Sequence, residues 1–533
     1  MNTIYKLLPA AAMLAFMGSC NDLDTQPMAG YVTSDQKADV IAQDPAMAEA
    51  SVNALPFMTK QYCGVFKDPG YQNDFGWPSS MLFLDSRTAD MPSTTSGYNW
   101  FGTGLDYSDK NATATSTRFH WSTNYNMIYS CNSVIKGIDI NTTSTELKYY
   151  LAQALGYRAW AYFNLAQLYQ FTYVGNEDKP CVPLITDENS DKAATDGAPR
   201  ATVAEVYELI NSDLDKAIEF LKESGHIAPA DRLGKQFMTA VTATGIRARV
   251  KLVQNKWSEA AADAQYVIQN SGATPYTIAE VSKPSFWDAS DHSWIFAICI
   301  ESGEVGNLHC WPGHFVTFYE GGYPAVGVYR KINKKLFENI SPTDVRKGWW
   351  CDETGYTPNV DAAHANILYG YFDSKEEAAY VNVKFDTYQS MFSGMCYLND
   401  LPLMRIEEMI LTLAEAQAMG GDTGSALNTL NNFIQTYRDP NYNFSSTSAT
   451  DIQDEIWNQR RVELWGEGIS YFDLLRLKKP MDRVGGGFEP SVCFNIPAGD
   501  PLLIYLIPQA EMQSNPGLTT NNPEGATPTP VVE

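Results

Sequence analysis

Residues 458–476, which read NQRRVELWGEGISYFDLLR, decide the fold. Arg and Glu recur there among apolar residues, and the same mixture returns in residues 403–416, which read LMRIEEMILTLAEA. Arg405 and Glu408 stand three positions apart, so a helix places them on one face while apolar neighbours face the core. We interpret the charged residues of both segments as structural, as Arg–Glu pairs that fix the register of packed helices. Trp465, inside the first segment, and the pair Trp349-Trp350 are assigned to packing.

Outward from these segments, apolar residues recur with a helical period and in pairs. The clearest helix is predicted over Thr202–Lys222, where one stripe is apolar and Thr202 forms a capping box with Glu205. Helix pairs are expected at about 125–172, 202–254, 404–438 and 451–478. Residues 257–260 and 424–427 resemble the second helix of tetratricopeptide units, whose pairs bury their apolar faces by stacking. The sequence therefore predicts a mostly α-helical scaffold of stacked pairs.

Both charged segments resemble the SusD/RagB family. Residues 458–476 are similar to its pattern E-R-R-x-E-L-x-x-E-G-x-R-Y-F-D-L-x-R, except that Ile469 and Ser470 replace the usual His-Arg. Any charge partner that the usual pair supplies is therefore expected to be missing. Residues 403–416 are similar to the family's helix with R-x-x-E and A-E-A, and residues 507–518 match its ending I-P-x-x-E-x-x-x-N-P-x-L. The helices predicted at Ala154–Tyr169 and Gly245–Val253 also resemble family helices.

The resemblance implies a SusD-like fold and a binding protein, not an enzyme. Family members are outer-membrane lipoproteins that sit as a lid over a SusC-like TonB-dependent transporter. They hold a glycan, or in some branches a peptide, at an aromatic surface and pass it into the transporter. The partners implied for this chain are an oligosaccharide or polysaccharide, the transporter and the outer membrane. No cofactor or metal is predicted, although some members bind calcium.

The N-terminus has the layout of a lipoprotein signal. Residues 7–16 form a short apolar run, and Cys20 follows small residues as in a lipobox. We predict a signal peptide over residues 1–19, lipid attachment at Cys20, a polar tether over 20–34 and one domain over 35–533. The alternative is an ordinary secretory signal cut elsewhere. Within the domain, we expect the helical scaffold at about 120–270 and 400–480, and loop-rich ligand regions at about 56–120 and 272–400.

Charge and motif content exclude several functional classes. The chain has 38 Lys and Arg against 62 Asp and Glu, a net charge of −24, which repels nucleic acid and anionic lipid headgroups. It contains no HExxH, GxSxG or GxxxxGK[ST] motif. His309, Cys310 and His314 lie close together, but no second Cys/His pair follows at metal-ligand spacing, so a polar loop is the favoured interpretation. The scattered cysteines form no CxxC, which leaves disulfides and buried thiols both open.

Aromatic residues set among Gly, Asn, Asp and Arg mark the candidate ligand surface. A sugar ring needs a flat aromatic platform for its C–H face and planar polar groups for its hydroxyls. The predicted ligand-binding residues are Trp77, Arg87, Tyr98, Asn99, Trp100, Trp287, Trp311, Tyr319 and Tyr323. The alternative for each ring is that it fills the core. The leading function is oligosaccharide capture, with peptide capture of the RagB type and an α-helical glycoside hydrolase as alternatives.

Overall fold

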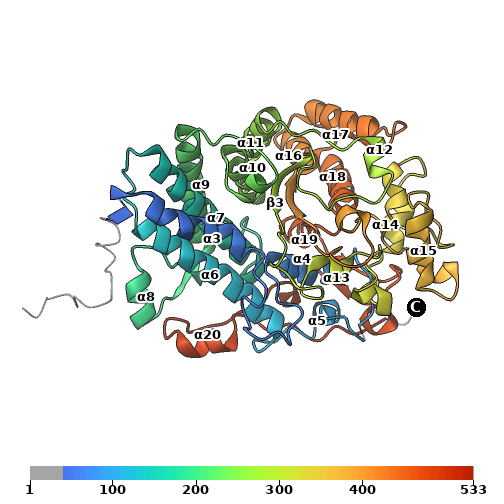
Figure 1. Cartoon of the computed structure of the whole chain (residues 1–533), viewed down its shortest axis with the longest axis horizontal. Coiled ribbons are helices and arrows are strands. Elements are labelled where there is room, and N and C mark those ends of the chain that lie inside the picture. Colours follow the sequence, from blue (N-terminus) through green and yellow to red (C-terminus); the bar gives the residue numbers. More distant parts are fainter. Residues whose placement is uncertain (1–39, 42, 96, 532–533) are drawn as a thin grey trace, which may run out of the picture.

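The fold is mostly helical, as predicted. The computed structural model describes residues 40–41, 43–95 and 97–531, and these contain 18 α-helices and a few short strands (Figure 1). The predicted signal peptide, Cys20 and the tether lie outside the described residues. Within the described ranges, no helix combines the length and the apolar character needed to cross a bilayer.

The scaffold is a stack of helices that follow one another along the chain. Helix α7 packs between α6 and α9, α10 packs against α9 and α11, and α16 packs against α11, α17 and α18 (Figure 1). These helices are α6 (Thr115–Lys136), α7 (Thr145–Tyr169), α9 (Val203–Glu223), α10 (Ala240–Val253), α11 (Trp257–Asn270), α16 (Ile406–Met419), α17 (Thr423–Tyr437), α18 (Ala449–Glu463) and α19 (Ser470–Arg476). The capping box of Thr202 and Glu205 at the start of α9 is confirmed.

Seven of the remaining elements lie within the two loop-rich regions, and the others lie before, between and after them. They are α3 (Ala46–Met58), α4 (Trp77–Ser86), α5 (Gly102–Leu105), β1 (Pro180–Pro183), α8 (Ser190–Asp196), β2 (Arg200–Thr202), α12 (Ile278–Val281), β3 (Trp294–Ile298), α13 (Trp311–Phe315), α14 (Lys334–Asn339), α15 (Ala362–Gly370), β4 (Leu401–Arg405), β5 (Met481–Asp482), β6 (Asn495–Ile496) and α20 (Gln509–Ser514). The strands pair as three antiparallel two-stranded ribbons, β1 with β2, β3 with β4 and β5 with β6.

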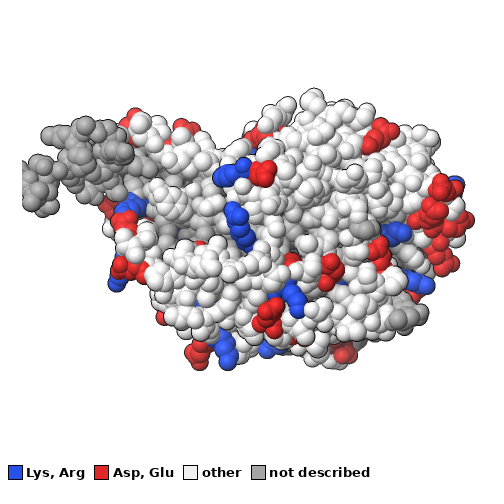
Figure 2. Space-filling view, turned by 90° about the horizontal axis from the view of Figure 1, so that it is seen from below, with Lys and Arg blue, Asp and Glu red and all other residues white. Residues whose placement is uncertain are grey.

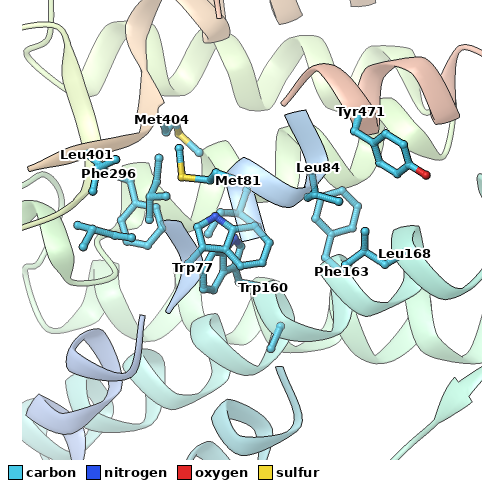
Figure 3. Close-up of a cluster of buried hydrophobic side chains, with 14 of the residues drawn as sticks. Trp77, Met81, Leu84, Trp160, Phe163, Leu168, Phe296, Leu401, Met404 and Tyr471 are labelled. Atoms are coloured by element: carbon cyan, nitrogen blue, oxygen red, sulfur yellow. The ribbon is translucent and has the colours of Figure 1, made fainter. Parts of the chain in front are cut away.

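Helix α4 lies at the centre of the molecule. It joins the two halves of the scaffold, which are the helices at about 120–270 and those at about 400–480. All ten of its residues are buried. Figure 3 shows Trp77, Met81 and Leu84 of this helix among side chains from α7, β3, β4 and α19. The close packing extends to α10, where a Cβ on Gly245 would lie 2.4 Å from the sulfur of Met404. The chain therefore has one continuous core that reaches from the helical pairs into the loop-rich regions.

A network of buried charges lies where the two family-like segments meet. Glu463 accepts hydrogen bonds from Arg438 Nε at 2.7 Å and from Arg405 Nη1 at 3.2 Å, and Arg346 Nη1 lies 3.3 Å away. Burial would raise the pKa of Glu463, but the surrounding guanidiniums, Arg438 first, outweigh it and hold this pKa well below its usual range. Glu467 is held in turn by Arg405 at 2.8 Å. The structural interpretation of these charged residues is confirmed.

The chain departs from the family pattern at Ile469 and Ser470, and the buried acid beside them, Asp90, still has partners. Asp90, from the first loop-rich region, accepts a hydrogen bond from the Ser470 hydroxyl and pairs with Arg461 Nη2 at 2.5 Å. Arg461, which the family pattern also contains, comes from the preceding helix, α18, and gives Asp90 its charge partner here.

Removing one charge from this network should destabilise the fold strongly. Glu463→Gln leaves three buried guanidiniums without their common carboxylate, and we expect the free energy of unfolding to fall by about 3–5 kcal/mol. Chemical denaturation measures this loss. Glu219→Gln is the control, because Glu219 is 51% exposed in its pair with Lys216 and should change stability by about 0.5 kcal/mol or less. Equal effects of the two variants would contradict the role assigned to the network.

Candidate functional site

A hollow of about 360 Å³ opens beside the first loop-rich region. It is lined by Tyr71, Asn73, Gly97, Tyr98, Asn99, Trp100, Thr103 and Thr115. Tyr98 is 62% exposed and Tyr71 39% exposed, while Trp100 is half-buried. The hollow therefore places several partly exposed aromatic residues side by side, and contiguous exposed apolar surface is a feature of ligand sites.

The second loop-rich region holds two of these rings in place through Tyr323. The Trp100 indole Nε1 donates a hydrogen bond to the Tyr323 hydroxyl at 3.0 Å. The Tyr98 ring stacks on the Tyr323 ring, with centroids 6.0 Å apart and planes 28° apart. The structure thus brings together three of the predicted site residues from two distant segments. Tyr323 itself is buried, so it acts as a support beneath the exposed rings.

Two amides beside the rings have different roles. Asn99 donates to Thr94 O at 2.6 Å and accepts from Phe101 N at 3.2 Å, so its side chain shapes the loop. Asn73 donates to Trp100 O at 3.1 Å, and its buried Oδ1 accepts no hydrogen bond from the described residues. Asn73 lines the hollow, and this oxygen is the polar atom of its side chain that lacks a partner among the described residues. Sequence reasoning that favours aromatic residues does not select Asn73, although Asn73 stands two positions after Tyr71.

A cation lies near the hollow, on the first turns of α6. The Arg118 guanidinium lies 5.3 Å from the centroid of the Phe66 ring, and Phe66 packs against Tyr71 at 4.6 Å. Arg118 is exposed and stands one turn after Thr115, which lines the hollow. It can offer planar donors to a ligand that extends beyond Tyr71.

Four predicted site residues are enclosed by the protein instead. Trp77 packs edge-to-face against Trp160 at 4.8 Å (Figure 3). Arg87 is 1% exposed and pairs with Asp109. Trp311 stacks on Phe315 at 4.2 Å, and the Tyr319 hydroxyl donates to a backbone carbonyl. We leave these four residues out of the proposed site, because none can reach a ligand without opening the core.

Trp287 lies elsewhere in the second loop-rich region. It is half-buried and contacts Tyr388 edge-to-face at 5.5 Å. It does not line the hollow that holds Tyr98 and Trp100. Trp287 is therefore separate from the candidate site in this structure.

Beneath the aromatic rings lies a buried layer of ionisable side chains. The His314 ring lies 4.6 Å from the Tyr323 ring, and burial lowers the pKa of His314 to about 3, so this imidazole is neutral. Arg330 Nη2 donates to Asn99 Oδ1 at 3.0 Å, while burial lowers the pKa of Arg330 to about 10. Burial likewise raises the pKa of Asp85 to about 8. His314 and Arg330 contact the residues that support the loop, whereas Asp85 accepts a hydrogen bond from Gly468 N at 3.2 Å.

The His309–Cys310–His314 run forms no metal site. His314 contacts the backbone carbonyls of Gln72 and Leu308, both at 3.0 Å. Within the described part of the chain, no group of three or more His, Cys, Asp or Glu side chains is placed to hold a metal ion. Cys63, Cys131, Cys181, Cys299, Cys310, Cys351 and Cys396 are free thiols.

Two family models together match most of the chain. Residues 58–252 match a model described as starch-binding and associating with the outer membrane, and residues 371–524 match the model of the SusD family. The chain belongs to the SusD/RagB family. Because the members of this family are binding proteins, the chain is a non-catalytic protein.

Relatives and solved structures agree with this assignment. The SusD-like protein P2 of Formosa agariphila is 23% identical over 424 residues, which are 76% of this chain and 79% of the relative. A SusD-like carbohydrate-binding protein from Bacteroides vulgatus has a TM-score of 0.72 at 22% identity, covering 89% of this chain and 97% of that chain. The surface glycan-binding protein A of Bacteroides thetaiotaomicron, solved with laminarihexaose, has a TM-score of 0.64 at 17% identity, covering 90% and 99%. Both likenesses show the SusD fold.

The buried Asp85 should make stability depend on pH in an unusual direction. An unfolded Asp loses its proton near pH 4, whereas folded Asp85 keeps its proton up to about pH 8. Between these values the folded state binds the extra proton, so stability falls as the pH rises, by up to about 1.4 kcal/mol per pH unit. Asp85→Asn should remove this contribution. The curve of unfolding free energy against pH should then be flatter between pH 5 and pH 7, a range that lies between the unfolded and the folded pKa of Asp85.

Denaturant titrations across this pH range test the prediction for Asp85. Asp482→Asn is the control, because Asp482 is 51% exposed. A wild-type slope retained in Asp85→Asn would contradict the role given to the buried carboxyl.

Proposed function

We propose that this SusD-family protein captures an uncharged oligosaccharide in the hollow formed by Tyr71, Asn73, Tyr98 and Trp100. The observation that carries the proposal is the combination of exposed rings with an unsatisfied amide oxygen in one hollow. The rings provide a platform for the apolar C–H face of a sugar, and the Asn73 oxygen accepts from a hydroxyl at its edge. No covalent chemistry is required of any residue in this site.

The charge distribution favours an uncharged ligand. The hollow borders α5, on the side of the molecule that is seen in Figure 2, where wide areas carry neither Lys or Arg nor Asp or Glu. The chain as a whole is acidic, at −24. An acidic polysaccharide would meet long-range repulsion from this net charge, whereas a neutral glycan would not.

The platform is held in place before a ligand arrives. Tyr323 supports Tyr98 and Trp100, and Asn99 with Arg330 fixes the loop between them. A surface that is already ordered loses little conformational entropy when it binds. Affinity can then come from a few ring contacts.

We further propose the cellular setting of this capture. Lipid attachment at Cys20 and a tether over residues 20–34 would anchor one domain, residues 35–533, at the outer-membrane surface, where it passes the glycan to a SusC-like TonB-dependent transporter. The lipobox-like N-terminus and the family's description as associating with the outer membrane support this proposal. Two acyl chains at Cys20 would give a stable attachment.

A glycan array or affinity-gel screen of the purified chain tests capture and places the site. We expect retention by one class of neutral glycan, and we expect Tyr98→Ala and Trp100→Ala each to weaken it about tenfold, because each removes a stacking face. Tyr356→Ala is the matched control, since Tyr356 is 58% exposed and does not line the hollow. Its retention should equal that of the wild type.

Other results of the same screen would overturn parts of the proposal. Retention that survives both substitutions keeps glycan capture but removes it from this hollow. Binding of peptides without any glycan assigns the chain to peptide capture of the RagB type. Release of free sugar, abolished by a single carboxylate substitution, would show a hydrolase.

A further inference from the structure

Aromatic contacts continue beyond the hollow along the loop of residues 62–75. Tyr71 lines the hollow and is 39% exposed. Its ring packs against the half-buried Phe66 ring, with centroids 4.6 Å apart. Phe66 in turn contacts Phe119, in the first turns of α6, at 6.0 Å. The edge of the hollow at Tyr71 is therefore connected to α6 through Phe66.

A buried carboxylate fixes this loop. Asp74 is fully buried, and its Oδ2 accepts hydrogen bonds from Phe66 N at 2.7 Å and from Val65 N at 3.0 Å. The second loop-rich region also holds the loop, because His309 Nε2 donates to Pro69 O at 2.9 Å. The loop is therefore held in position without a ligand, and little conformational entropy is lost when one binds.

Arg118 rests on this loop with its side-chain donors unused. Its guanidinium lies 5.3 Å from the centroid of the Phe66 ring. The side chain is exposed, and it forms no ion pair or hydrogen bond with the described residues. A guanidinium presents several N–H donors in a fixed planar fork, which can serve two adjacent hydroxyl groups of one sugar. Arg118 is therefore a donor group that awaits an acceptor.

Two connections place Arg118 at the edge of the hollow. Along α6 it follows Thr115, which lines the hollow, by nearly one helical turn. Across the loop, it rests on Phe66, which packs against Tyr71 of the hollow. The hollow, at about 360 Å³, is near the lower end of ligand-pocket volumes, roughly 300–1,000 Å³. It therefore encloses only a short part of an oligosaccharide, and a longer chain has room to continue past Tyr71.

We infer that Arg118 forms an outer subsite through which this protein selects longer chains. A linear neutral oligosaccharide occupies the hollow with one end and continues past Tyr71. There the Arg118 guanidinium donates hydrogen bonds to two adjacent hydroxyl groups of an outer sugar. The inference rests on the proposed function and adds a length requirement to it, since a chain confined to the hollow does not reach Arg118.

Titration of the purified full chain with short and long members of four neutral series tests this inference. The pairs are maltose and maltohexaose, laminaribiose and laminarihexaose, cellobiose and cellohexaose, and mannobiose and mannohexaose. We expect at least one hexasaccharide to bind, and Arg118→Met to weaken it about tenfold through the loss of hydrogen bonds from a charged donor. The affinity for the disaccharide of that series should stay at the wild-type value. Calorimetry measures the hexasaccharides, and saturation-transfer NMR measures the weaker disaccharides.

Control variants separate the outer subsite from the hollow and from the fold. Arg118→Met keeps an apolar stem on the Phe66 ring and should leave the melting temperature unchanged. Lys192→Met removes another exposed cation, on α8, and should bind every probe as the wild type does. Tyr98→Ala should weaken both members of a pair, because Tyr98 lines the hollow.

The outcomes distinguish a failure of this inference from a failure of glycan capture. If Tyr98→Ala weakens a hexasaccharide and Arg118→Met does not, the hollow keeps its function and the outer subsite is overturned. An equal loss of disaccharide and hexasaccharide affinity in Arg118→Met would also overturn it, because Arg118 would then act within the hollow. If no hexasaccharide binds the wild type, capture of these neutral glycans fails and the inference fails with it.

Discussion

Glu463 and the guanidiniums around it constrain the rest of the structure. Arg405 immediately precedes α16, Arg438 immediately follows α17, and Arg346 comes from the second loop-rich region, so a single carboxylate joins three separate parts of the chain. Buried charges tolerate little displacement, because each must stay within hydrogen-bonding distance of its partner. A buried ion cluster adds little net stability over an apolar one, but it defines which helices meet and in which register. The loop-rich regions are therefore attached to the scaffold at a fixed position.

The aromatic platform depends on that fixed position. Tyr323 can support Tyr98 and Trp100 only if the second loop-rich region lies against the first. Asp90 strengthens the same attachment from the other side, since it belongs to the first region and pairs with Arg461 of α18. The scaffold and the platform therefore hold fixed positions relative to one another. Polar contacts set these positions, and the aromatic residues face the ligand.

The sequence predicts the scaffold better than the site, and particular residues show why. The α9 helix is visible because one of its faces is polar and its capping box is local. The α4 helix escapes such reasoning because all its residues are buried, so no apolar period distinguishes its faces. Trp311 and Tyr98 both stand near glycines, yet Trp311 is 2% exposed and Tyr98 62% exposed. Their burial is decided by partners far along the chain, such as Phe385 against Trp311, which local patterns do not contain. The match of Arg461 to Asp90 is long-range for the same reason.

The bond between Trp100 and Tyr323 also bears on how such a surface changes over evolutionary time. A substitution that removes the hydroxyl at position 323 leaves a half-buried indole N–H without its acceptor, which is costly. A new ring at position 100 would in turn leave that hydroxyl unmatched. Ligand preference in this lineage should therefore shift through paired replacements in two segments more than two hundred positions apart, while the helical frame stays the same.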